Sequence, residues 1–163
     1  MKRTLLNLIA IPCLSISAVA MADPEYVTIK MEIDVAKPAD AVWAAVGDYC
    51  GISEWLSIDC TITSGDGIGA VRSLAGGRIT EIMVAQTELS YGYTQPAVEG
   101  AFYNLYHGFM EARPTGESSS KIIYTLMLDV SNMADQAAKD ADVTRRRATF
   151  ERALVSMKEL AEK

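Results

Sequence analysis

The sequence predicts an α+β fold: a seven-stranded antiparallel sheet wrapped around one long C-terminal helix, with two short helices after the first strand. Three observations support it. Residues 26–35 alternate apolar and polar side chains, as a half-buried strand does. Six further strand-like runs follow, separated by turn signals at hairpin spacing. Residues 133–161 contain no Gly or Pro and place apolar residues close to one helical stripe. A helix covering one face of such a sheet leaves a cavity suited to small apolar ligands.

The first strand is followed by two short helices. Pro38 fits the first turn of the first helix, and a second helix over 52–56 carries Trp55. In the first helix, the apolar residues at helical spacing are Val42, Trp43 and Val46.

The middle of the chain then forms strands. The predicted strands are 59–64, 70–74, 78–86, 89–95, 101–112 and 121–130. Glycines at 65–67 and 76–77 mark tight turns, and the polar run 113–120 is predicted to be a hairpin loop. The chain has 163 residues with neither repeat nor linker, so one domain is expected.

Composition excludes two classes of function. Lys and Arg total 15 against 21 Asp and Glu, a net charge of −6, which removes the basic surface that nucleic-acid binding needs. A single histidine excludes a multi-histidine metal site, and we expect neither a metal nor a cofactor.

The N-terminus has the pattern of a secretory signal. A basic start, an uncharged apolar run over 4–19 and small residues at Ala20 and Ala22 predict a signal peptide over 1–22 and a domain over 23–163. The apolar run is shorter than the roughly 20 residues of a membrane span, although a retained anchor is the alternative. We therefore expect a periplasmic or secreted protein without a stable membrane span after signal removal.

Two cysteines, Cys50 and Cys60, remain after residue 22. An even number of cysteines in an exported domain predicts a disulfide, with two buried free thiols as the alternative.

The order of elements and several local sequences resemble the superfamily of START domains, birch-pollen-allergen-like proteins and polyketide cyclases (the SRPBCC superfamily). The segments that carry the resemblance are Val35–Trp43, Gly67–Arg72, Ile79–Ile82 and Leu89–Tyr91. It covers essentially the whole chain after residue 22. It implies a helix-grip fold with a cavity for a lipid-, sterol- or aromatic-like ligand, in a family of carriers, allergens and aromatase/cyclases.

Residues 60–93 are also similar to plant abscisic-acid receptors, but they depart where those receptors hold hormone. The receptor gate corresponds to Leu74–Arg78, which lacks the proline, and the receptor latch has no counterpart before Tyr103–Asn104. The lysine that takes the hormone carboxylate falls at Glu54, of opposite charge. Hormone reception is therefore not implied.

Glu81 is the strongest single candidate for the site. Its strand neighbours Ile79 and Met83 are apolar, and the matching Glu of the resembling receptors faces the cavity and holds ligand through water. A carboxylate in an apolar cavity would have a raised pKa and could accept a proton. The alternatives are an outward Glu81, or one paired with Arg72 or Arg78.

Other candidates for the cavity wall come from aromatic and apolar residues. Tyr103, Leu105, His107 and Phe109 alternate in phase, so we expect them to share the cavity face, with Tyr106 on the other face. His107 is a weak candidate for proton transfer with Glu81, and a hydrogen-bonded wall histidine is the alternative. The remaining candidates for the wall, one end and the lid are Tyr91, Tyr93, Trp55, Phe150, Leu154 and Met157. Ordinary core packing is the alternative for all six. Arg145–Arg147 reads as a solvated helix face, with anionic lipid contact as the alternative.

The expected function is an exported carrier of a small hydrophobic molecule rather than an enzyme. One alternative is a cyclase/dehydratase-like enzyme, which needs Glu81 and His107 in one cavity. Another is an exported accessory protein that binds a protein partner, which an exposed apolar rim at the cavity mouth would favour.

Overall fold

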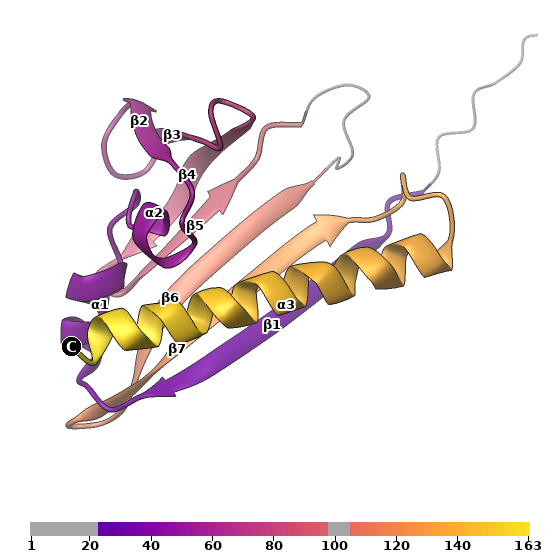
Figure 1. The fold of residues 1–163 in the computed structure, drawn as a ribbon. Helices are drawn as coiled ribbons and strands as arrows, with labels where there is room; N and C mark the ends of the chain where they lie inside the picture. The colour runs from indigo at the N-terminus through magenta and orange to yellow at the C-terminus, as the bar shows by residue number, and fades with distance from the viewer. Residues whose placement is uncertain (1–22, 98–104) are drawn as a thin grey trace, which may run out of the picture.

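The computed structural model describes residues 23–97 and 105–163 of the chain (Figure 1). The described residues form one seven-stranded antiparallel sheet in the order β1-β7-β6-β5-β4-β3-β2, with helices against one face. This confirms the predicted fold class. The predicted signal peptide (1–22) and Tyr103 lie outside the described residues and stay predictions.

The sheet consists of seven strands. The strands are β1 (Tyr26–Val35), β2 (Cys60–Ser64), β3 (Val71–Leu74), β4 (Ile79–Thr87), β5 (Ser90–Thr94), β6 (Tyr106–Gly116) and β7 (Ser119–Asp129). β1 has the predicted bounds and pairs with β7 along its whole length. Two short helices, α1 (Ala39–Val46) and α2 (Ile52–Trp55), connect the edge strands β1 and β2.

The prediction of a loop over 113–120 is wrong. β6 and β7 continue to Gly116 and from Ser119, which leaves a two-residue turn. A register shift between Pro114 and Gly116 accommodates the proline, because a bulge spares it from donating a ladder hydrogen bond.

The long helix α3 (Gln136–Ala161) crosses the sheet (Figure 1). The Asp135 carboxylate caps its N-terminus by accepting a hydrogen bond of 2.8 Å from the Ala138 N–H. Its C-terminal half buries an apolar face composed of Phe150, Ala153, Leu154, Met157 and Ala161. The N-terminal half presents charged residues instead, and these border the cavity described below.

A glycine on β6 makes room for an aromatic ring of the sheet. Gly108 pairs with Tyr93 of β5, and a Cβ atom built on Gly108 would lie 2.1 Å from the Tyr93 ring. Only glycine allows the Tyr93 ring to lie flat over the neighbouring strand.

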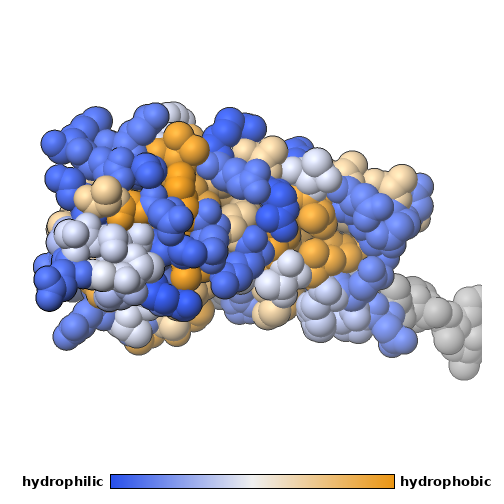
Figure 2. Space-filling view, turned by 90° about the horizontal axis from the view of Figure 1, so that it is seen from below, coloured by the Kyte–Doolittle hydropathy of each residue, from blue (hydrophilic) through white to orange (hydrophobic). Residues whose placement is uncertain are grey.

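The outer surface is mostly hydrophilic on the side shown in Figure 2, where apolar residues form separate islands between polar ones. No helix in the described part of the chain is long and apolar enough to cross a membrane.

Candidate functional site: a cavity between the sheet and α3

A cavity of about 310 Å³ lies between α2, strands β3 to β6 and helix α3. Part of its lining is apolar and consists of Ile52, Leu56, Ile58, Leu74, Ile79 and Phe150. The rest of its lining is polar or carries a hydroxyl and consists of Glu81, Tyr93, Gln95, Tyr106, Arg145, Arg146 and Thr149. A separate hollow of about 270 Å³, between residues 47–50 and the β2–β3 turn, has a more polar lining and does not reach Glu81.

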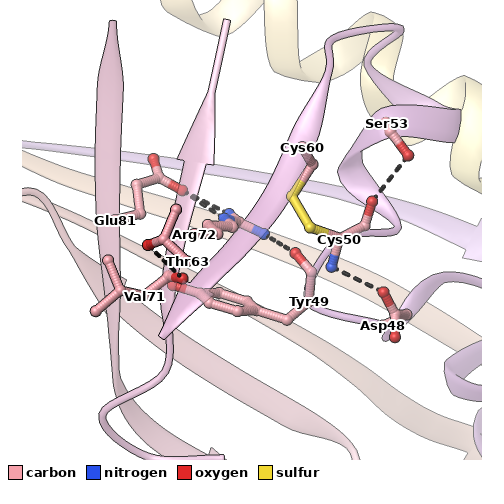
Figure 3. Close-up of a disulfide and its surroundings, with 9 residues drawn as sticks. All are labelled: Asp48, Tyr49, Cys50, Ser53, Cys60, Thr63, Val71, Arg72 and Glu81. Atoms are coloured by element: carbon pink, nitrogen blue, oxygen red, sulfur yellow. Dashed lines mark hydrogen bonds and ion pairs between the residues drawn. A yellow bond between two sulfur atoms is a disulfide. The ribbon is translucent and has the colours of Figure 1, made fainter. Parts of the chain in front are cut away.

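On the sheet side, Glu81 lines the cavity and forms a buried ion pair with Arg72, which lies behind it (Figure 3). Arg72 of β3 and Glu81 of β4 are directly opposite in register and are 0% and 3% exposed. The guanidinium donates to one Glu81 oxygen from Nε and Nη2, at 2.8 and 2.6 Å. Gln95 Nε2 donates to the other oxygen at 3.1 Å, so both carboxylate oxygens have protein donors. Of the alternatives for Glu81, the structure shows pairing with Arg72.

The Arg72 guanidinium is surrounded by further partners. Its Nη1 donates to the Tyr49 carbonyl, and its Cζ lies 4.2 Å from the Tyr49 ring centroid and 4.9 Å from that of Tyr93. Ring faces attract the cation, and hydrogen bonds between two ionised groups are stronger than those between neutral ones. Burial raises the pKa of Glu81, and the Arg72 charge opposes that rise. Glu81 is therefore a fixed hydrogen-bond acceptor rather than a free base.

Tyrosines continue this wall into the core. The Tyr93 and Tyr124 hydroxyls share a hydrogen bond of 2.7 Å, and the ring centroids of Tyr93 and Tyr106 lie 6.4 Å apart. Burial raises the pKa of Tyr93, Tyr106 and Tyr124, so these phenols stay protonated and offer both a flat surface and a hydroxyl.

On the helix side, one carboxylate serves two arginines. Asp142 accepts a hydrogen bond of 2.8 Å from Arg146 Nε and a second from Arg145 Nη2. The Arg146 side chain is only 13% exposed, and its Cζ lies 5.1 Å from the Tyr106 ring centroid. Burial lowers the pKa of Arg146 to about 10, which leaves it charged at neutral pH. The prediction of a solvated face is therefore wrong for Arg146. The Arg145 side chain is 64% exposed, although it lines the cavity together with Arg146, and the Arg147 side chain is exposed as well.

The predicted disulfide between Cys50 and Cys60 is present (Figure 3). It joins the α1–α2 connection to β2, next to β3. The bond therefore fixes the segment whose Tyr49 carbonyl and ring hold Arg72.

Three of the predicted wall residues, Glu81, Tyr93 and Phe150, line the cavity. Three more are buried in the surrounding core without lining it: Tyr91, Leu154 and Met157. Trp55 is also buried, but it borders a different hollow, between α2 and α3.

The predicted orientation of β6 is wrong. Its buried face carries Tyr106, Gly108 and Met110, so His107 and Phe109 lie on the opposite face, where Phe109 is 37% exposed. Leu105 precedes the strand and is half-buried. Both faces of this strand carry aromatic residues, so alternation alone did not decide which face is inward. The feature that could have indicated the inward face is Gly108, which lies opposite Tyr93 in the sheet. His107 and Glu81 do not meet in one cavity.

Sequence reasoning also missed several residues that line the cavity. It did not assign Ile52, Leu56, Gln95, Arg145 or Arg146 to the site. The two arginines were not assigned to the site because a run of charged residues is usually solvated.

A profile of the family described as "Polyketide cyclase / dehydrase and lipid transport" matches residues 26–162, nearly all of the described chain. No curated protein sequence matches the chain significantly.

Several solved structures share the fold. A protein from Thermobifida fusca, solved by NMR, is 23% identical and superposes with a TM-score of 0.66 over 82% of this chain and 92% of its own. A norcoclaurine synthase point mutant from Thalictrum, in complex with a transition-state analogue, is 16% identical, with a TM-score of 0.64 over 86% and 97%. An aromatase/cyclase from Streptomyces sp. R1128 is 17% identical, with a TM-score of 0.61 over 84% and 92%. At these identities the likeness shows the helix-grip fold alone.

Proposed function

Because the chain belongs to the polyketide cyclase/dehydrase and lipid transport family, we propose that it is an exported carrier that holds a small hydrophobic molecule between its sheet and α3. One observation carries the proposal: the lining of the cavity combines apolar side chains, which suit the body of a ligand, with hydrogen-bonded polar groups, which suit its functional group. Its volume of about 310 Å³ lies at the lower end of the range known for ligand sites, roughly 300–1,000 Å³. The ligand is therefore small.

The geometry favours a carrier over a proton-transfer enzyme. His107 lies on the opposite face of the sheet from the cavity. Both oxygens of Glu81 already accept hydrogen bonds from Arg72 and Gln95. Among the described residues, the cavity lining contains no histidine, cysteine or second carboxylate beside Glu81. A base that must first leave its buried partner is poorly placed for catalysis.

Export is supported by two independent features of the sequence and structure. Residues 1–22 have the order of a secretory signal, and the Cys50–Cys60 disulfide suits an oxidising compartment. The proposed location is therefore periplasmic or secreted.

The test uses the full chain expressed with its own N-terminus in a Gram-negative bacterium. The periplasmic fraction is expected to contain a form whose intact mass lacks residues 1–22. Native mass spectrometry should show a bound compound, which is then released and identified. A protein found only in the cytoplasm at full mass would overturn export. A protein without adduct, and with no thermal shift from a panel of fatty acids, sterols and aromatics, would overturn the carrier.

A matched pair of variants on β4 tests the location of the ligand. Ile79 lines the cavity, whereas Val84 is exposed on the same strand. Ile79→Trp should fill the cavity and abolish ligand retention, while Val84→Trp should retain the ligand. Retention by both folded variants would place the ligand elsewhere.

A further inference from the structure

The outer face of the sheet carries no helix in the described part of the chain. Helices α1, α2 and α3 all lie against the opposite, inner face, which holds the core and the cavity (Figure 1). On β1 the inner face carries the buried residues Ile29, Met31 and Val35, so the side chains that alternate with them point outward. The register of β1, β7 and β6 then shows which outward side chains are neighbours.

Three large side chains form a diagonal across this outer face. Tyr26 on β1, Met127 on β7 and Phe109 on β6 are 58%, 39% and 37% exposed. Met127 is opposite Thr28, which is two residues from Tyr26. Phe109 is opposite Thr125, which is two residues from Met127. Diagonal positions on neighbouring strands are within reach of aromatic and long side chains, so the three residues form one continuous apolar strip, the outer strip.

Beside the outer strip the face stays flat. The Phe109 ring lies over β5, since a Cβ atom built on Gly92 would be 3.3 Å from it. His107, Thr94 and Ile82 lie opposite one another on β6, β5 and β4 and extend the face away from the strip. None of these residues is an Asp, Glu, Lys or Arg. A second sheet can therefore pack against this face at about 10 Å, the usual separation of stacked sheets.

The charged side chains of the outer face pair with one another. Lys121 lies 2.6 Å from Glu32 and 3.8 Å from Asp34. Arg113 lies 2.7 Å from Glu111. The exposed and half-buried charged residues of the strands are Lys30, Glu32, Asp34, Glu111, Arg113 and Lys121. Their charges sum to zero, whereas the whole chain has a net charge of −6.

This charge pattern favours a second copy of the chain as the partner. A strongly basic or acidic partner finds no open charge on this face to complement. Two copies repel each other through their net charge of −6 each, and the repulsion is weakest where the facing groups sum to zero. A two-fold axis also brings the outer strip of one copy against that of the other, as an isologous interface requires.

We propose that two copies of the chain pack back to back through the outer faces of their sheets, with Tyr26, Phe109 and Met127 at the centre of the interface. The cavity lies on the inner face of each sheet and stays open in this dimer. The assembly is therefore independent of the molecule that the cavity holds.

Sedimentation equilibrium of the protein purified from full-chain expression measures the assembly over a series of concentrations. The mass should rise from that of one copy to that of two. Phe109→Glu should raise the dissociation constant at least about a hundredfold, because it buries an unpaired charge in the interface. Val155→Glu is the matched control, since Val155 is 47% exposed on α3, and it should leave the dissociation constant unchanged.

Two further variants keep the test decisive. Met127→Lys makes the chain less negative, so a loss of the dimer cannot come from general repulsion, and it should weaken the dimer as much as Phe109→Glu does. Phe109→Ser adds no charge at an exposed position, so it should fold even if the charged variants do not. It should weaken the dimer about tenfold. Melting curves show which variants fold.

Three outcomes overturn the proposal. A wild-type protein that stays monomeric at every concentration has no such interface. A dimer that survives the changes at Phe109 and Met127 in folded protein uses another face. Equal weakening by Val155→Glu and Phe109→Glu would assign the effect to overall charge.

Discussion

The two charged walls of the cavity are built alike but completed differently. In the sheet wall, one guanidinium lies against one carboxylate on the adjacent strand. Gln95 donates a further hydrogen bond to the carboxylate, and the Tyr49 carbonyl accepts one from the guanidinium. The helix wall places two guanidiniums against one carboxylate within a single turn of α3. In the first arrangement both partners are buried, and in the second the Arg145 side chain is 64% exposed.

This difference predicts unequal effects on stability. Removing one member of a closed, buried pair leaves an uncompensated charge in the core, which is costly. Removing one member of the helix cluster affects a charge that is still partly hydrated and leaves other partners in place. We therefore expect the sheet wall to contribute more to stability than the helix wall.

The largest effect is expected for Arg72→Met. This change leaves Glu81 buried with only Gln95 as a partner, and breaking such a pair costs roughly 3–5 kcal/mol of the free energy of unfolding. Urea denaturation at pH 7 measures it. Arg78→Met is the matched control, because Arg78 is exposed, and it should cost less than about 0.5 kcal/mol.

The pH dependence of Arg72→Met identifies the cause of its instability. Burial raises the pKa of Glu81, and the charge of Arg72 opposes that rise, so the pKa should rise further in the variant. A folded-state pKa above the unfolded value means that the folded protein binds the extra proton. The variant's deficit should therefore shrink as the pH falls from 7 towards about 5. A deficit that stays constant or grows over this range would assign the loss to packing.

The next largest effect is expected from the disulfide that supports the sheet wall. Replacing both Cys50 and Cys60 by Ser opens a loop with a sequence separation of 10, worth roughly 2–3 kcal/mol of unfolding free energy. Reductant should lower the stability of the wild type by a similar amount and leave the variant unchanged. A wild-type protein whose stability does not change with reductant would contradict this contribution of the disulfide.

Strict alternation allowed the sheet to be predicted well. β1 has the predicted bounds because five apolar side chains alternate without interruption between Val27 and Val35. The β6–β7 hairpin was predicted too short, since Pro114 and the serines near 119 are typical of loops and only the pairing of two long strands draws them into the sheet.

The site was harder to predict, because it depends on which residues meet. Glu81 was identified from its apolar neighbours, but its partner was left open between two arginines. In the structure, the register of β3 against β4 places Arg72 directly opposite Glu81. His107 was assigned to the wrong face because alternation gives the period of a strand and not its direction. Arg146 was assigned to solvent, since hydropathy does not reveal that a bond to Asp142 allows its guanidinium to be largely buried.

The smallest change in stability, and the most informative about the helix wall, is expected for Asp142→Asn. Asparagine keeps an acceptor oxygen for one of the two arginines, so the loss should be about 1 kcal/mol, far less than for Arg72→Met. Urea denaturation measures this loss, with Asp140→Asn as the control at an exposed position of the same helix. If Asp142→Asn instead destabilised the protein as much as Arg72→Met, the helix cluster would be a closed structural unit like the sheet pair, and the contrast between the walls would fail.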